Sequence, residues 1–336
     1  MQLTVQIESY PLRNPFSTAA LTIDSVDVVV VTLEQDDVSG KGEAAGVYYK
    51  NETPTQMVEQ IVDVRSRIMR NPSRDVLRKL LPPGGARNAL DCALWDLEAK
   101  QAHCAVCKLA GLQEPRKLMT LFTCGAADPK EMARVARSYG ARAIKIKLLG
   151  DSRDADRVRS VREAVPEAWL IVDANQGLTK QAFDALLPVL VEARVGLLEQ
   201  PFPVTEDRLL EGIQSPIPLV ADESAQCLQD LPDTVGRFEF VNIKLDKCGG
   251  LTEGLAMVSR ARELGLKTYV GNMFGTSLAM APGFILGQIC DVVELDGPVF
   301  LGRDRDIPVQ YRDGYIYCPE QVWGGPRNNG LEDRLA

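Results

Sequence analysis

The stretch ARAIKIKLLGDSRDADRVRSVREAVPEAWLIVDAN, residues 141–175, decides the fold. It contains an apolar strand-like segment (AIKIKL), a helix-like segment (DADRVRSVREAV) and a second apolar strand (AWLIVD). A strand, a helix and a second strand in this order favour a unit of two parallel strands. Side chains two residues apart on a strand share a face, so Lys145 and Lys147 share one environment. Taken alone, such a pair is typical of a solvent-exposed strand face.

The same alternation continues on both sides of this stretch, from about residue 118 to residue 296. The strand-like segments are LMTLFTC, ARAIKIKL, AWLIVDAN, VGLLEQP, IPLVADES, FVNIKLD, LKTYVGN and VVELDGP. Helix-like segments such as PKEMARVARSY and GLTEGLAMVSRAREL separate them. Eight strands in this rhythm predict an α/β fold, a TIM-type (β/α)7β barrel over residues 116–318.

The first part of the chain, residues 1–115, has a different pattern. VQIESYPL and SVDVVVVTLEQ have the β-branched density of antiparallel strands, and DDVSGKG before EAAGVYY predicts a hairpin turn. TQMVEQIVDVRSRIM and GGARNALDCALWDLEAKQ carry apolar residues at helical spacing. We therefore expect a small α+β domain here. The polar tail, residues 319–336, is expected to pack poorly.

Composition and charge restrict the function. The 336 residues carry a net charge of −8 without acidic blocks, which argues against a nucleic-acid or anionic-membrane partner. No apolar run approaches the roughly 20 residues of a membrane helix, and MQLTVQIESYPL lacks the features of a signal peptide, so we expect a cytoplasmic protein. Because the chain has 1 histidine, an enzyme that moves protons must use lysines and carboxylates.

Each predicted barrel strand ends in a polar residue, and successive ones lie 22 to 28 residues apart. They are Thr123, Lys145 with Lys147, Asp173, Glu199, Asp222, Lys244, Asn272, and Glu294 with Asp296. In a parallel barrel the carboxyl ends of the strands meet at one mouth, where functional groups gather. This spacing therefore predicts an active site at the mouth of the barrel.

Three consecutive strands end in Asp173, Glu199 and Asp222. Converging carboxylates repel one another unless a positive charge lies among them, and a hard divalent cation such as Mg²⁺ prefers oxygen ligands. The alternative, carboxylates paired with arginines at the rim, predicts solvated loops. LIVDAN, GLLEQP and PLVADES instead place these acids at the ends of buried strands, which favours a metal site.

Lysines flank the predicted metal site on both sides. Lys145 and Lys147 lie on the strand before Asp173, and Lys244 lies on the strand after Asp222. A substrate carboxylate on Mg²⁺ would then have a lysine on each face of its α-carbon. Lys147 and Lys244 would exchange the α-proton from opposite faces, while Lys145 and the metal would stabilise the enediolate. Two bases on opposite faces predict inversion at carbon.

The chain resembles the enolase superfamily, in its muconate lactonizing enzyme subgroup. KIK, DAN, EQP, ADES and NIKLDKCGG occur in the order and spacing of that family. ARNALDCALWDLEAK at 86–100 is similar to the helix signature of its capping domain, and YPLRNPFSTA at 10–19 is similar to its substrate-capping loop. The resemblance covers nearly the whole chain and implies that residues 1–115 form a cap over the barrel.

The resemblance also implies roles for single residues. Lys147 and Lys244 would be the acid/base pair and Lys145 an auxiliary lysine, with Asp173, Glu199 and Asp222 as ligands of one Mg²⁺. Thr123 and Asn272 would contact the substrate. Asn175 and Asp246 would support the site from behind, Asp246 by a hydrogen bond or an ion pair with a site lysine.

Within the subgroup, the ending VVELDGP is most similar to the dipeptide epimerases of the L-Ala-D/L-Glu type. These enzymes carry an Asp-x-Asp pair there, which holds the ammonium group of the dipeptide. In this chain the pair is Glu294 and Asp296, so one acid is longer by one methylene. An arginine of the capping loop binds the glutamate side chain in that type, and Leu21 lies where it would fall. We therefore expect a dipeptide with a small or apolar second residue, unless Arg13 replaces that arginine.

Other functions remain open from the sequence. A muconate cycloisomerase, an o-succinylbenzoate synthase or an N-acylamino acid racemase would use the same metal and lysines without an acidic pair for an ammonium group. A metal-free aldolase with Lys244 or Lys147 as a Schiff base leaves the three carboxylates without a role. A non-catalytic binding protein would not need the full set of lysines and acids. By analogy with related barrels, a symmetric homo-oligomer is also open.

Overall fold

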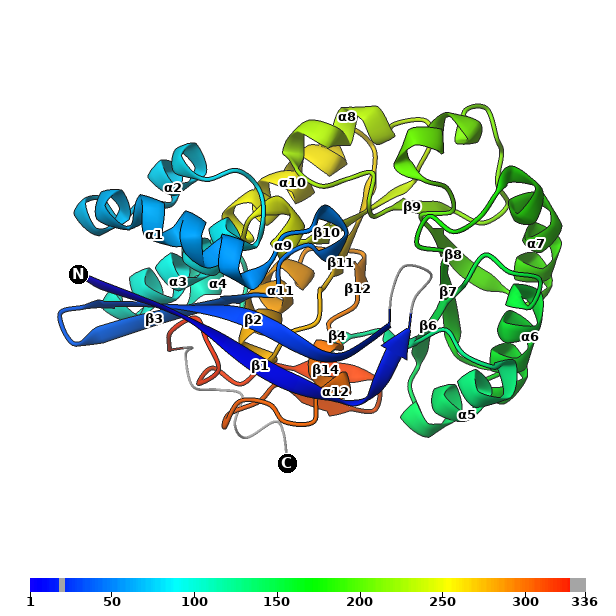
Figure 1. Cartoon of the computed structure of the whole chain (residues 1–336), viewed down its shortest axis with the longest axis horizontal. Helices are drawn as coiled ribbons and strands as arrows, with labels where there is room; N and C mark the ends of the chain where they lie inside the picture. Colours follow the sequence, from blue (N-terminus) through cyan, green and yellow to red (C-terminus); the bar gives the residue numbers. More distant parts are fainter. Residues whose placement is uncertain (18–21, 327–336) are drawn as a thin grey trace.

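The computed structural model describes residues 1–17 and 22–326 (Figure 1). It contains an antiparallel three-stranded sheet, an eight-stranded sheet of parallel strands and a small three-stranded sheet. In Figure 1 the helices that follow the parallel strands surround them, whereas the first sheet and its helices lie to one side. This arrangement confirms the predicted TIM-type barrel with an N-terminal α+β cap. No described helix is both long and apolar enough to cross a membrane.

The cap consists of a sheet covered by helices. Its strands are β1 (Gln2–Ser17), β2 (Thr22–Gln35) and β3 (Val38–Ala44), and its helices are α1 (Pro54–Arg70), α2 (Arg74–Leu80), α3 (Gly85–Gln101) and α4 (Val106–Leu109), with a 3-10 turn η1 (Tyr48–Lys50). The predicted hairpin turn lies at Asp36 and Asp37, whose φ angles of 51° and 64° suit a tight hairpin. The third strand therefore starts at Val38, earlier than expected from EAAGVYY.

Helix α1 begins where its sequence allows an N-terminal cap. The side chain of Thr53 accepts a hydrogen bond from the Gln56 backbone amide, the side chain of Gln56 accepts one from the Thr53 backbone amide, and Pro54 follows the cap. Such a reciprocal pair satisfies two amide groups that the helix itself leaves free. The apolar side of the helix then packs into the cap core with Met57, Ile61, Val64 and Ile68.

The barrel strands run parallel in chain order. They are β5 (Phe122–Cys124), β6 (Ala143–Lys147), β7 (Trp169–Asp173), β8 (Val195–Glu199), β9 (Leu219–Ala221), β10 (Phe240–Lys244), β11 (Lys267–Gly271) and β12 (Val292–Val293). The Leu121 amide donates to the Val293 carbonyl at 2.9 Å, so the first strand meets the last and the sheet closes.

The segments between the strands differ in length. Long helices follow five strands: α5 (Pro129–Tyr139), α6 (Asp154–Ala164), α7 (Lys180–Glu192), α10 (Leu251–Glu263, after the short α9, Leu245–Cys248) and α11 (Ser277–Gly287). The helices expected after β8 and β9 are instead 3-10 turns, η2 (Val204–Leu210) and η3 (Leu228–Asp230), with one short α8 (Leu231–Thr234). After β12 come α12 (Gly297–Phe300), β13 (Gln310–Arg312) and β14 (Tyr315–Tyr317). The last two strands form a small sheet with β4 (Leu118–Met119), which precedes β5 in the chain.

The period of two along each strand decides which side chains enter the barrel. On β6, Ile144 and Ile146 pack outward in the large core beneath the helices, whereas Ala143 belongs to the apolar cluster inside the barrel. Lys145 and Lys147, which share the parity of Ala143, therefore point inside, and both are buried. The alternative of a solvent-exposed lysine face is wrong.

The part of the tail that the structure describes is well packed. The Trp323 side chain is buried, and its Nε1 donates to the Lys41 carbonyl at 2.9 Å. The Gly324 amide donates to Asp96 Oδ1 at 2.8 Å. The expectation of poor packing is thus wrong here, because one large aromatic side chain anchors a polar segment to the cap. Residues 327–336 of the expected tail lie outside the described residues.

Candidate active site

The predicted strand-end residues gather around one cavity of about 450 Å³ at the barrel mouth. Its lining includes Thr123, Lys145, Lys147, Asn175, Asp222, Lys244, Asn272, Glu294 and Asp296. Residues of the cap, among them Phe16 and Tyr48, form the opposite wall. The cavity therefore lies between the barrel and the cap.

Three carboxylates at the floor of the mouth lie close enough to share one cation. One oxygen from each of Asp173, Glu199 and Asp222 lies within 4.8 Å of the others, and all three side chains are buried. Glu199 Oε2 forms an ion pair with Lys145 Nζ at 2.9 Å. Three buried carboxylates so close together are a donor set that fits a hard divalent cation. The residues present therefore fit the predicted Mg²⁺.

Each predicted catalytic lysine contacts a different acid of this triad. Lys147 Nζ lies 2.6 Å from Asp173 Oδ2, and Lys244 Nζ lies 2.7 Å from Asp222 Oδ2. Their strands, β6 and β10, are four positions apart in the closed order of eight strands. The two lysines therefore approach the triad from opposite sides of the mouth.

Lys145 lies deeper than Lys147, with three carboxylates around its ammonium group. Its Nζ is 2.9 Å from Glu199 Oε2, 3.1 Å from Asp173 Oδ2 and 2.9 Å from Glu294 Oε2. Burial acts to lower the pKa of Lys145, but Glu199 and Glu294 outweigh it and raise that pKa well above its usual value. Lys145 is therefore a buried positive charge held among three carboxylates.

The triad carboxylates differ in acidity. Burial acts to raise the pKa of Asp173, but Lys147 and Lys145 outweigh it and lower that pKa to about 2. Lys244 and Lys247 likewise overcome burial and lower the pKa of Asp222. For Glu199, burial and the charge of Asp173 raise the pKa to about 8. The three acids share the positive charge of the nearby lysines, and a cation among them would add further positive charge beside Glu199.

The two residues expected to support the site lie in different places. The Asn175 amide donates to Asp173 Oδ1 at 2.8 Å, so Asn175 does contact the predicted ligand. Asp246 does not pair with a site lysine in the described contacts. Its Oδ1 accepts from the amides of Ala45 and Gly46 at 2.9 and 3.0 Å, because the turn after β10 points it toward the cap.

The residues predicted to contact the substrate already form hydrogen bonds with other groups of the protein. Glu294 accepts hydrogen bonds from Lys145, Tyr269 and Thr123, and Asp296 accepts one from the Thr123 amide. Asn272 Oδ1 accepts from the Asp296 amide at 3.1 Å, and its Nδ2 donates to the Met273 carbonyl. Thr123 and Asn272 thus position the two acids of the last strand.

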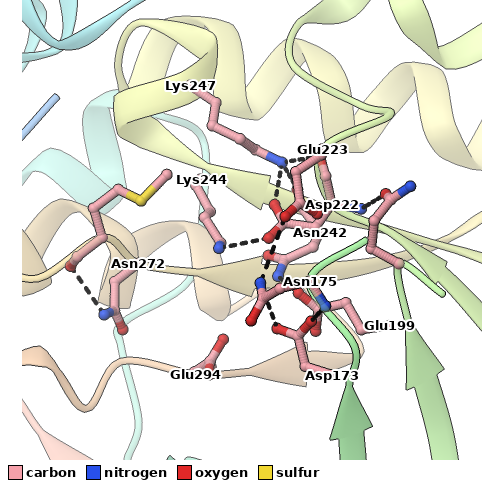
Figure 2. A network of polar contacts seen from close by, with 12 residues as sticks. Asp173, Asn175, Glu199, Asp222, Glu223, Asn242, Lys244, Lys247, Asn272 and Glu294 are labelled. Atoms are coloured by element: carbon pink, nitrogen blue, oxygen red, sulfur yellow. Dashed lines mark hydrogen bonds and ion pairs between the residues drawn. The ribbon is translucent and has the colours of Figure 1, made fainter. Parts of the chain in front are cut away.

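Three residues of the site were not among the predicted strand-end residues. Lys247, three residues after Lys244, contacts Asp222 Oδ1 at 2.6 Å, and Figure 2 shows both lysines pointing toward this acid. Asn242 Nδ2 donates to Glu199 Oε1 at 2.9 Å, and Tyr269 OH donates to Glu294 Oε2 at 2.8 Å. Asn242 lies two residues before Lys244, so strand parity could have identified it. Tyr269 lies two residues before Gly271, where β11 ends in the structure, but three before Asn272, the end expected from the sequence.

Two family models match the chain. The model "Mandelate racemase / muconate lactonizing enzyme, N-terminal domain" covers residues 1–111, and "Enolase C-terminal domain-like" covers residues 128–324. The chain belongs to the enolase superfamily.

Similar proteins narrow this enolase-superfamily assignment. An L-Ala-D/L-Glu epimerase of Escherichia coli strain K12 is 37% identical over 92% of this chain and 97% of its own length. An N-acetyl-D-glutamate racemase of a Pseudoalteromonas species is 36% identical over 90% of this chain and 96% of its own length. The enzyme is therefore an isomerase, an epimerase or racemase that acts on amino acid derivatives.

Solved structures agree with this assignment. An enolase family member from Agrobacterium tumefaciens, with homology to dipeptide epimerases and with sodium and L-Ala-L-Glu bound, has a TM-score of 0.93. It is 36% identical, and the match covers 96% of this chain and 99% of that one. A dipeptide epimerase from Enterococcus faecalis, in complex with Mg and L-Leu-L-Tyr, has a TM-score of 0.87 at 26% identity, over 96% and 98% of the two chains.

The cap side of this enolase-superfamily cavity is apolar around Phe16, while Asp27 and Glu52 also line it. The Phe16 ring lies edge-on to Phe274 and Phe300, with centroids 4.9 and 5.0 Å apart, and Ile23 lines the same wall. Arg13 Nε donates to the Leu301 carbonyl at 2.7 Å, and Arg13 is not among the lining residues. Leu21, on which the expected side-chain preference depends, lies outside the described residues.

Proposed function

We propose that the protein is an Mg²⁺-dependent dipeptide epimerase, which inverts the α-carbon of the C-terminal residue of an L-Ala-L-Xaa-type dipeptide. The observation that carries this proposal is the placement of Lys147 and Lys244. They contact different acids of one buried carboxylate triad and come from strands on opposite sides of the barrel. The names of similar proteins, dipeptide epimerases among them, support the substrate class.

The residues suggest a division of work. Asp173, Glu199 and Asp222 would hold Mg²⁺, which supplies a Lewis acid that makes the α-proton of a carboxylate substrate easier to remove. Lys147 removes the α-proton from one face as a general base, and Lys244 returns a proton to the other face. Lys145 stays protonated and stabilises the negative charge of the enediolate. Because the lysines are on opposite faces, the product has the inverted configuration.

The cavity supports a small or apolar side chain at the inverted residue. Phe16, Ile23 and Phe274 supply an apolar wall. No arginine lines the cavity among the described residues, and residues 18–21 contain no basic side chain. A glutamate side chain would therefore lose a bidentate partner, which makes L-Ala-L-Glu a poor substrate.

The test is α-proton exchange in D₂O. A mixture of L-Ala-L-Xaa dipeptides is incubated with the protein and Mg²⁺, and mass spectrometry follows the gain of one deuteron. We expect exchange with apolar second residues, and a fall of about 10²–10⁴-fold in Lys147→Ala. Lys244→Ala should keep exchange on the Lys147 face and lose inversion, followed by chiral chromatography, by a similar factor. Chelation of Mg²⁺ should abolish it. No exchange on any dipeptide would contradict the substrate class.

A second candidate is racemisation of N-acylamino acids. It is favoured by the similarity to an N-acetyl-D-glutamate racemase and by Glu294, whose carboxylate already has partners within the protein. The same assay with N-acetyl-L-amino acids in place of dipeptides distinguishes the two. Exchange confined to the N-acetyl compounds would establish the second candidate.

A further inference from the structure

Glu294 is held by three side chains from three other strands. Lys145 Nζ donates to Oε2 at 2.9 Å, and Tyr269 OH donates to the same oxygen at 2.8 Å. Thr123 Oγ1 donates to Oε1 at 3.0 Å. A carboxylate has about four acceptor positions, so three are filled by the protein. Glu294 is therefore built into the wall and has little capacity left for a ligand.

For Lys145, Glu294 is the acid that does not belong to the triad. The other two carboxylates within 3.1 Å of its ammonium group are those of Asp173 and Glu199. A divalent cation held by these two acids would weaken their attraction for Lys145 and would itself repel the ammonium group. Glu294 would then be the remaining anion that keeps Lys145 in place.

Asp296 accepts fewer hydrogen bonds from the protein than Glu294 does. Its Oδ2 accepts from the Thr123 amide at 2.7 Å, and the Thr123 side chain also reaches this carboxylate. Asp296 thus depends on one residue, whereas three residues donate to Glu294. Because the Asp296 side chain lines the cavity, it offers the substrate more acceptor capacity than Glu294 does.

The extra methylene of Glu294 explains this division. Glu294 follows β12, and Lys145 lies on β6, with β5 between them in the closed sheet. The Glu294 side chain must therefore extend past Thr123 on β5 to reach Lys145. An aspartate would be shorter by one carbon–carbon bond, about 1.5 Å. At that length a direct contact of 2.9 Å with Lys145 would be lost.

We propose that Glu294 is a positioning residue for Lys145, and that Asp296 alone of the two acids binds the amine of the substrate. This rests on the proposed function and changes the roles that the resemblance implied, in which both acids hold the ammonium group. Loss of Glu294 then affects the chemical step through Lys145, whereas loss of Asp296 affects only the binding of a free amine.

The test compares Glu294→Gln, Glu294→Asp and Asp296→Asn on L-Ala-L-Phe and on N-acetyl-L-Ala-L-Phe, by α-proton exchange in D₂O. For both Glu294 variants we expect kcat to fall about 100-fold on both substrates, because a displaced Lys145 no longer meets the developing charge. Their KM should stay within about threefold of the wild type. Asp296→Asn should raise KM for the free amine about 10- to 100-fold and leave the acetylated substrate nearly unchanged.

Glu294→Asp decides between the two roles. It restores the pair of aspartates that the dipeptide epimerases use for the ammonium group, so retained or improved turnover of L-Ala-L-Phe would overturn the proposal. A rise in KM confined to the free amine in Glu294→Gln would overturn it as well. If the wild type accepts only the dipeptide, that substrate alone decides between the two roles: a lower kcat at unchanged KM in the Glu294 variants supports the proposal, and a higher KM at unchanged kcat overturns it.

If neither substrate exchanges, the proposed function fails and the inference is decided without turnover. ¹⁵N NMR of lysine-labelled protein, with Lys145→Met to assign the signal, should show a slowly exchanging ammonium group in the wild type, since Lys145 is fully buried. With Mg²⁺ present, and when circular dichroism shows both variants folded, this signal should broaden or vanish in Glu294→Gln and Glu294→Asp. An unchanged signal would overturn the proposal.

Discussion

At the scale of single residues, Lys247 makes more contacts with the triad than its place in the sequence suggests. Its Nζ lies 2.6 Å from Asp222 Oδ1, and it donates to the carbonyls of Asp222 and Asn242 at 2.5 and 2.8 Å. All three donors of the ammonium group are thereby used, and the side chain is fully buried. Lys247 fixes the carboxylate of Asp222 from the side opposite to the cavity.

We predict that Lys247→Met lowers the free energy of unfolding by about 1–3 kcal/mol, because it leaves the buried carbonyls of Asp222 and Asn242 without this donor, while the Asp222 carboxylate keeps Lys244. Urea denaturation followed by circular dichroism measures this. The control is Lys180→Met, which breaks an exposed contact with Asp184 and should cost less than about 1 kcal/mol. Equal losses in the two variants would show that Lys247 does not hold Asp222.

At the scale of elements, β3 and α3 approach each other closely because β3 carries glycines on the side that faces the helix. A Cβ at Gly42 would lie 2.1 Å from the Ala89 carbonyl oxygen, and one at Gly40 would lie 2.4 Å from the Ala93 carbonyl oxygen. These obstacles are helix backbone, which cannot rotate away as a side chain can. The close approach places Glu43 and Ala45, at the end of β3, against the barrel.

Gly42→Ala is therefore expected to destabilise the protein by at least about 1–3 kcal/mol, the usual cost of overpacking, and to reduce soluble yield. Thermal unfolding by calorimetry checks the size of the change. Lys41→Ala is the matched control on the same strand, since its side chain is exposed, and it should stay within about 0.5 kcal/mol. A folded Gly42→Ala with unchanged stability would mean that β3 and α3 can separate freely.

At the scale of the whole molecule, buried carboxyl groups join the cap to the barrel. Asp91 on α3 accepts from the amide and hydroxyl of Thr252, and Asp246 accepts from two amides of the cap. Burial raises the pKa of Asp91 to about 6 and that of Asp246 to about 7. Both lie above the value of about 4 for an unfolded aspartate, so the folded state binds more protons. This contribution to stability is complete below about pH 4 and is lost as the pH rises through 7.

Asp246→Asn should therefore gain stability relative to the wild type as the pH rises from 5 to 8. The change removes the titrating group and keeps an oxygen for the amides of Ala45 and Gly46. The relative gain is bounded by about 4 kcal/mol, the free energy of a three-unit pKa shift. Urea midpoints measured at intervals of half a pH unit would show it, and parallel curves for the two proteins would contradict it.

Metal binding should also be visible in the stability of the whole chain. A ligand that binds only the folded state raises the free energy of unfolding by about 2.7 kcal/mol at 100 times its Kd. We expect Mg²⁺ to raise the melting temperature of the wild type and not that of Asp222→Asn, because the triad loses a charged oxygen donor. Equal shifts in both proteins would place the cation elsewhere.

Much of the site could be predicted from the sequence, because it repeats with the β/α unit. Asp173, Glu199, Asp222 and the flanking lysines lie at or next to the ends of strands, and parallel strands in a closed sheet bring these ends together. Lys247 was missed because it lies in α9, the short helix after β10. The partners predicted for Asp246 were wrong because this helix places its carboxylate against the cap.

The sequence alone determined the barrel, the cap and the set of acids and lysines at the mouth, because hydrophobic period and strand spacing are local properties of the chain. Only the tertiary structure decided which charges neutralise one another. Glu294 and Lys145 are 149 residues apart, and their contact depends on closure of the sheet and on one methylene of reach. The burial of Trp323 against the cap was decided in the same way, since a contact across the fold has no signature in the neighbouring residues.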